Sequence, residues 1–232
     1  MRKGYLLLAL LFVTTLALAQ NRQTVDVRDF DQISMKIGGT VYVTQGDKNE
    51  VVLEGDQDDI DKLEVEVRNG ELRIESRRRS SWRFWNSGNV RVDVYVTVKE
   101  LNSVTVSGSG DIVGRNTIET DRFRARVSGS GDIEMDIDAK EVQSSISGSG
   151  DIELSGSASS GTLSISGSGK FLAEKLRVDD FEVKISGSGR SSITVYGELD
   201  VRISGSGSVY YAGEPTGVNS SISGSGKVRR IN

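Results

Sequence analysis

Three aspartates recur with a spacing that could hold a cation. Asp111, Asp132 and Asp151 each occupy the fourth position after the first serine of a Ser-Gly-Ser-Gly motif. If consecutive motifs stack about 4.8 Å apart, their carboxylates repel one another unless they are hydrated, paired or bridged by a cation. Calcium prefers oxygen ligands and tolerates irregular coordination. We weigh a calcium site against a row of solvated turn residues, and favour the latter because the nine-residue calcium-binding repeat has another period.

The same position in later motifs is mainly basic, as at Lys170 and Arg190. Carboxylates beside cations resemble the sites of parallel β-helix enzymes that act on acidic polysaccharides, but a fold does not determine a function. Catalysis needs groups that converge on one pocket, and a regular row open to water does not provide one. The chain also has no histidine and no cysteine, which excludes the commonest general base and the Ser-His and Cys-His pairs. We expect no enzyme and no cofactor.

A segment rich in arginine and aromatic residues is the best candidate for a ligand-binding surface. Guanidinium groups and aromatic rings can stack on sugars or hold an anionic partner. Alternatively, the aromatic side chains close one end of the fold while the arginines remain solvated. We expect no nucleic-acid binding, because the chain is acidic overall, with a formal net charge of −4. The candidate residues are Arg77, Arg78, Arg79, Trp82, Arg83, Phe84 and Trp85.

The elements that position these residues follow from an internal repeat. Ser-Gly-Ser-Gly begins at residues 107, 128, 147, 166, 186, 204 and 223, so one repeat is 18 to 21 residues long. Glycine suits a sharp corner, where a positive φ or a close backbone approach would penalise any Cβ. The glycines predicted to form these turns are Gly108, Gly110, Gly129, Gly131, Gly148, Gly150, Gly167, Gly169, Gly187, Gly189, Gly205, Gly207, Gly224 and Gly226.

The residues around each motif alternate with the period of a half-buried strand. The residue before the motif is always Val or Ile, and the residues two and four positions before it are always polar. Each repeat therefore predicts a strand, a tight turn and a second strand. A flexible Ser-Gly linker is the alternative, but linkers do not carry a Val or Ile beside every copy. Parallel stacking of the repeats would bury the apolar stripe in an all-β solenoid with about 18–21 residues per coil.

The start of the chain predicts export. Arg2 and Lys3 precede a short apolar run that ends in Ala17-Leu18-Ala19, the pattern of a signal peptidase site. We predict a signal peptide over residues 1–19, a β-rich starting and capping region over 20–101, and the repeat solenoid over 102–232. Asn69-Gly70 between two strand-like runs predicts a hairpin in the capping region. We expect a mature protein that does not span the membrane, located in the periplasm, at the cell surface or outside the cell.

The sequence resembles the head GIN domain family of auto-transporter adhesins, which is common in Bacteroidetes. The resemblance covers nearly the whole chain after residue 19 and implies a right-handed parallel β-helix-like superhelix. The family is described as adhesive, but the resemblance itself implies little about activity and supplies no catalytic residues. The matching features are Phe30-Asp31-Gln32-Ile33, Val41-Tyr42-Val43-Thr44-Gln45-Gly46-Asp47, Leu72-Arg73-Ile74, Val94-Tyr95-Val96-Thr97-Val98 and the run of Ser-Gly-Ser-Gly repeats.

We therefore expect an exported, non-catalytic adhesion or ligand-binding protein of the bacterial envelope. Its partner would be a glycan or a surface protein of the envelope or the host. A structural scaffold of the periplasm is the alternative, and an enzyme acting on acidic polysaccharides is the least favoured. The exposed ends of the stacked sheets favour association with other chains, end to end or side by side.

Overall fold

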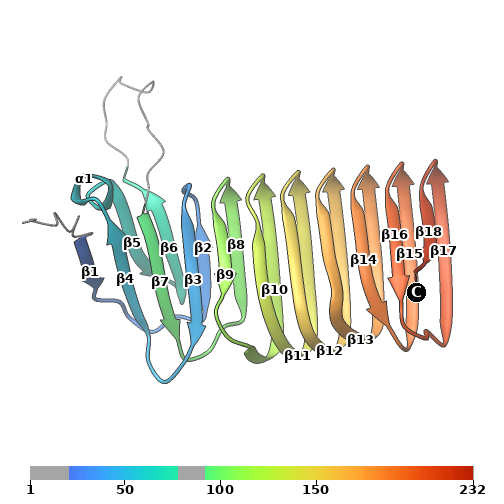
Figure 1. The fold of residues 1–232 in the computed structure, drawn as a ribbon, viewed down its shortest axis with the longest axis horizontal. Helices are drawn as coiled ribbons and strands as arrows, with labels where there is room; N and C mark the ends of the chain where they lie inside the picture. The colour runs from blue at the N-terminus through green and yellow to red at the C-terminus, as the bar shows by residue number, and fades with distance from the viewer. Residues whose placement is uncertain (1–20, 78–91, 232) are drawn as a thin grey trace, which may run out of the picture.

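The structure is a computed structural model that describes residues 21–77 and 92–231. The predicted signal peptide, residues 1–19, lies outside the described residues. The described chain forms an elongated column of stacked β-coils, with one short helix near the N-terminal end (Figure 1). The predicted all-β solenoid is confirmed. Within the described residues, no helix is long and apolar enough to cross a membrane.

The repeat region is built from strands that enter and leave the Ser-Gly-Ser-Gly turns. The strand segments that enter the turns are paired with one another in parallel, and together they form the lead-in face. The segments that leave the turns are also paired in parallel, and they form the lead-out face. The turns line one long edge of the column, the turn edge (Figure 1). The strands are β8 (Ser103–Gly108), β9 (Asp111–Gly114), β10 (Ile118–Gly129), β11 (Ile133–Gly148), β12 (Asp151–Gly167), β13 (Lys170–Gly187), β14 (Arg190–Val195), β15 (Glu198–Gly205), β16 (Ser208–Ala212), β17 (Gly217–Gly224) and β18 (Lys227–Arg230).

Around the Ser-Gly-Ser-Gly turns the strands stack in a register that places like residues above one another. Ile146 of β11 lies beside Ile165 of β12, which lies beside Ile185 of β13, and all three are buried. The hydrophobic core is thus a set of columns of Val, Ile, Leu and Phe between the two faces. Burying such side chains stabilises a fold by about 1.5–3 kcal/mol each relative to exposure. The predicted inward position before each motif is confirmed in every coil but the last.

The two glycines of each turn are required for different reasons. The first has a positive φ, for example 134° at Gly148, which L side chains rarely adopt. The second packs against the coil before it: a Cβ on Gly150 would lie 2.1 Å from the carbonyl oxygen of Gly131. The Gly129 carbonyl in turn accepts the Ser149 amide at 2.9 Å, so the hydrogen-bond ladder continues through the turns.

The opposite long edge of the column, the bend edge, has no Ser-Gly-Ser-Gly turn among the described residues. The long strands β11, β12 and β13 continue around it, and two consecutive outward residues mark each bend, such as Lys140 and Glu141. Insertions are absorbed locally: the register of β13 against β12 shifts between Glu153 and Ser155, where β13 holds one extra residue. Coils of different length therefore keep their turns in line.

The region before the repeats contains two further coils. Its elements are β1 (Asn21–Val25), β2 (Gln32–Met35), β3 (Thr40–Gln45), β4 (Glu50–Gly55), α1 (Gln57–Ile60), β5 (Leu63–Arg68), β6 (Glu71–Ser76) and β7 (Val92–Val98). Strands β2 and β3 pair in parallel with β8 and β9 on one side and with β6 and β7 on the other. The coil of β2 and β3 therefore lies between the coil of β6 and β7 and the first repeat, out of chain order.

The N-terminal end of the column is capped by antiparallel strands. On the lead-in face β5 pairs with β6 through the predicted hairpin, where Asn69 and Gly70 have φ values of 53° and 79°. On the lead-out face β4 pairs with β7, and β1 covers β4. Helix α1 joins β4 to β5 and buries Ile60 against the core. This cap ends the parallel stack.

Candidate functional site

The aspartate row lies at the turn edge and accepts hydrogen bonds from the backbone. A carboxylate oxygen of Asp111 accepts the Asp132 amide at 3.1 Å, and one of Asp132 accepts the Asp151 amide at 2.8 Å. Asp151 accepts both the amide and the Nζ of Lys170, at 2.9 and 3.0 Å. Burial raises the pKa of Asp111, a backbone hydrogen bond opposes this, and the charge of Asp132 adds to it. Each carboxylate thus ties its turn to the next coil.

No described set of three or more His, Cys, Asp or Glu side chains is arranged to hold a metal ion. Calcium binding at the aspartate row stays the less favoured alternative to a row of solvated turn residues.

The predicted arginine and aromatic segment begins where the described part of the cap ends. The Arg77 amide donates to the carbonyl of Lys62 at 2.7 Å. The candidates Arg78, Arg79, Trp82, Arg83, Phe84 and Trp85 lie outside the described residues. Strand β6 precedes the segment and belongs to the lead-in face, and strand β7 follows it and belongs to the lead-out face.

A polar hollow of about 430 Å³ lies on the lead-in face where the repeats meet the capping region. Its cause is a step between neighbouring strands. The pairing of β10 with β8 begins at Arg124 and Ser103, so the residues of β10 before Arg124 extend beyond β8. We call this the junction hollow. It is lined by Gln32, Asn102, Ser103, Asp121, Arg122, Phe123, Arg124 and Gln143.

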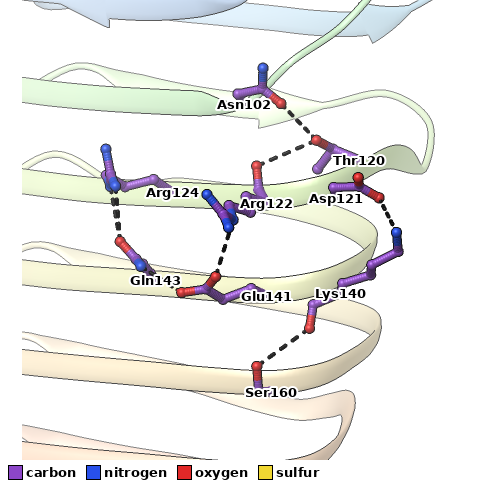
Figure 2. Close-up of polar contacts among 9 residues, drawn as sticks. All are labelled: Asn102, Thr120, Asp121, Arg122, Arg124, Lys140, Glu141, Gln143 and Ser160. Carbon is purple, nitrogen blue, oxygen red and sulfur yellow. Dashed lines mark hydrogen bonds and ion pairs between the residues drawn. The ribbon is translucent and has the colours of Figure 1, made fainter.

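Hydrogen bonds between coils hold the polar side chains of the junction hollow in place (Figure 2). Both Nε and Nη2 of Arg124 donate to Oε1 of Gln143, at 3.2 and 3.0 Å. Gln143 Nε2 donates to Glu141 at 2.6 Å. On the other side Thr120 donates to Asn102 at 2.7 Å, and Asn102 donates to Asp31 of the capping region at 2.8 Å. The hollow is therefore preorganised by contacts on both sides of the junction.

The charges at the junction hollow are mixed and leave one guanidinium largely free. The Arg122 side chain is 83% exposed, and its Nε lies 3.4 Å from Glu141, which makes a loose pair. Asp121 forms an ion pair with Lys140 at 2.8 Å (Figure 2). The hydrogen bond from Lys140 and its positive charge lower the pKa of Asp121. Guanidinium, amide and hydroxyl groups can bind carboxylate, sulfate and sugar hydroxyl groups.

A second polar surface lies on the lead-out face of the capping region. Tyr42 and Tyr95 stack with ring centroids 5.1 Å apart, and the Arg115 guanidinium lies 4.0 Å above the Tyr42 ring. Burial and the charges of Glu54 and Asp93 raise the pKa of Tyr95. Because the rings face each other and Arg115, this cluster offers little free ring surface to a ligand.

The lining of the junction hollow is not evident from the sequence. Arg124 and Arg126, four and two positions before a motif, are predicted to point outward and do so, and Arg122 continues the alternation along β10. Nothing in the repeat pattern, however, shows that one neighbouring strand starts later than the others. The alternating arginines beside the first repeat were the only available signal.

Comparisons with known proteins support the architecture. A putative adhesin from Bacteroides fragilis is 23% identical, with a TM-score of 0.81 over 91% of this chain and 97% of that chain. A putative lipid binding protein from Parabacteroides distasonis is 23% identical, with a TM-score of 0.73 over 92% and 97% of the two chains. A putative adhesin from Parabacteroides merdae is 18% identical, with a TM-score of 0.70 over 92% and 96%. At these identities the likeness shows the fold alone.

A search of curated proteins finds no match. The model of one protein family matches residues 29–215, which is most of the chain. The matched span includes both faces of the solenoid and the junction hollow. The chain therefore belongs to the family described as "Putative auto-transporter adhesin, head GIN domain".

Proposed function

We propose that this protein is an exported, non-catalytic binding protein that attaches to acidic glycans through the junction hollow. One observation carries the proposal: polar side chains from four strands, including Arg122 and Arg124, line a preorganised hollow on the lead-in face. Its volume of about 430 Å³ is within the range of small-molecule sites. Side chains already held in place lose little conformational entropy on binding.

The chemistry of the hollow favours a charged, hydroxylated ligand. Arg122 offers a guanidinium that Glu141 holds only loosely, and this group can pair with a carboxylate or sulfate. Ser103, Gln32 and Asn102 add hydroxyl and amide groups that match sugar hydroxyls. Phe123, the one apolar side chain of the lining, is buried, so no exposed apolar side chain of the lining is available to an acyl chain. The hollow therefore suits a glycan better than a lipid tail.

Binding fits the described residues better than catalysis. Asp121 and Arg122 of the hollow pair with Lys140 and Glu141, which lie beside it, and the pairing with Lys140 lowers the pKa of Asp121. A lowered pKa keeps this carboxylate ionised, whereas a general acid at neutral pH needs a raised one. The adhesive description of the family agrees with a binding role.

The test is calorimetric titration with oligosaccharides of uronic acids, sulfated sugars and neutral hexoses. We expect an acidic series to bind, and the double variant Arg122→Ala/Arg124→Ala to weaken that binding by about tenfold or more, since each charge-assisted hydrogen bond contributes roughly 1.5–3 kcal/mol. The matched control is Lys184→Ala/Arg202→Ala, which removes two basic groups from the same face, away from the hollow. Equal losses in both variants, or equal binding of neutral sugars, would contradict the proposal.

Exposure at the cell surface separates an adhesin from a periplasmic scaffold. We expect protease added to intact cells to cleave the protein, because an adhesin must reach its ligand. Protection in intact cells, together with cleavage after the outer membrane is opened, would favour the scaffold.

A further inference from the structure

The C-terminal end of the column exposes the core that every other coil buries. Leu199 and Ile203 of β15 are buried, but Val218 and Ile222, beside them on β17, are 40% and 42% exposed. These two are the large exposed hydrophobic residues among residues 21–77 and 92–231. Among residues 21–77 and 92–231, no further coil lies over the side chains that point between the two faces of the coil of β17 and β18.

The backbone of the last coil is also open on one side. Strand β17 pairs only with β15, and strand β18 only with β16, within the described part of the chain. Their outer amides and carbonyls are therefore free to pair with another strand. Native edge strands are usually protected by charges, proline or bulges. Strand β17 has none of these, because Gly217–Gly224 is a regular strand without charge or proline.

We propose that two copies of this chain associate end to end through their C-terminal coils. An open end of two strands, separated by the thickness of the core, is best covered by two strands with the same separation. The last coil of a second copy provides them, and it brings apolar residues to the same positions. The seam would bury Val218, Ile222 and Val228 of both copies and pair the free backbone groups.

Charge selects the arrangement of the two copies. Strand β18 carries Lys227, Arg229 and Arg230, whereas β17 is uncharged. Strands β17 and β18 run in opposite directions, because a turn joins them. A two-fold axis parallel to the strands places each β17 antiparallel to the β18 of the second copy, so the basic strands never lie opposite each other.

The N-terminal end is a poorer partner for this surface. Its edge strand on the lead-in face, β5, carries Glu64, Glu66 and Arg68, and Arg68 pairs with Glu66 at 2.7 Å. Charged edge strands resist pairing with a further strand. Association by the two C-terminal ends closes after two copies, whereas head-to-tail stacking would continue into filaments.

The test measures the mass of the purified chain by light scattering and sedimentation over a range of concentrations. We expect a concentration-dependent dimer, whose maximum dimension in X-ray scattering is nearly twice that of the monomer. The variant Ile222→Lys places a charge in the seam and should be monomeric at every concentration. The matched control Ser221→Lys adds the same charge one residue away, on the outer face, and should still dimerise.

A second measurement keeps the proposal falsifiable if Ile222→Lys fails to fold. Hydrogen exchange of the β17 amides in the native chain should slow as concentration rises, while exchange in β5 should not change. A native chain that is monomeric throughout, a dimer that survives a folded Ile222→Lys variant, a compact side-by-side dimer, or growth beyond two copies would each overturn the proposal.

Discussion

The two ends of the column are made from the same kind of strand but finish differently. At the N-terminal end, β5 and β4 pair antiparallel to the last parallel strands, and α1 carries Ile60 into the core. At the C-terminal end, β17 and β18 repeat the geometry of the coils before them and leave Val218 and Ile222 exposed. Repetition can extend a stack, but only a departure from the repeat can end it.

The junction hollow is a consequence of the same contrast. From β10 to β13 each strand pairs with the next over nearly its whole length, with one register shift between β12 and β13. Where the repeats meet the capping region, β8 starts later than β10, and a hollow forms. The offset between these two strands thus creates the junction hollow.

The largest effect should come from shortening core side chains at the two ends. Leu72→Ala in the capping region should reduce the free energy of unfolding by about 3 kcal/mol, because Leu72 is completely buried. Ile222→Ala removes as many carbons but should cost less than about 1 kcal/mol in the monomer, since this side chain is already partly in water. Guanidinium denaturation at low protein concentration measures both. Equal costs would mean that the last coil is covered as fully as the cap.

Turn glycines should show the next largest contrast. Gly150→Ala places a Cβ 2.1 Å from the Gly131 carbonyl oxygen and 2.8 Å from a Val127 methyl group, in a coil held on both sides. We expect a loss of about 2–3 kcal/mol in unfolding free energy. In Gly226→Ala the closest contacts are 2.7 and 3.0 Å, and the last coil can shift outward, so the loss should be about 1 kcal/mol. A greater loss for Gly226→Ala than for Gly150→Ala would refute this explanation.

Two serines in one core column should respond differently to removal of the hydroxyl group. Ser144 is buried, and its Oγ has no hydrogen-bond partner, which makes the hydroxyl costly. Ser144→Ala should therefore raise the free energy of unfolding by about 1 kcal/mol. Ser220 occupies the same column in the last coil but is exposed, so Ser220→Ala should change little. Thermal unfolding of the two variants measures both effects. Destabilisation by Ser144→Ala would show that the Ser144 hydroxyl group has a hydrogen-bond partner.

The smallest effects should be pH-dependent and opposite in sign. The pKa of Glu75 in the capping region is lowered, chiefly by its hydrogen bond to Lys36, so this pair stabilises the fold above the unfolded pKa and is lost on acidification. Glu75→Gln should be slightly less stable at pH 7, with the difference closing near pH 3. The pKa of Asp111 is raised by burial, so its ionisation costs stability as pH rises. Asp111→Asn should be slightly more stable at pH 7 only.

Melting temperatures of both variants and the native chain at the two pH values measure these differences. A gap of the same size at pH 3 and pH 7 would exclude ionisation as the cause.

Much of the fold could be predicted because its causes are local. Val or Ile before each motif and the alternation around it place residues such as Ile165 in the core. The aspartate row was found by its spacing, but its hydrogen bonds to the next coil were not, because they depend on how far each turn is offset from its neighbour. The junction hollow could not be predicted, since Gln32 and Arg124 are brought together only by stacking.

The sequence by itself determined the coil, its turn and the two sides of each strand, because glycine conformation and period-two alternation act within a few residues. Only the tertiary structure decided the order of the coils. It placed β2 and β3 between β7 and the first repeat, capped one end and left the other open. Pairing of distant strands depends on which edges and apolar surfaces remain uncovered after the local elements form, and no single repeat contains that information.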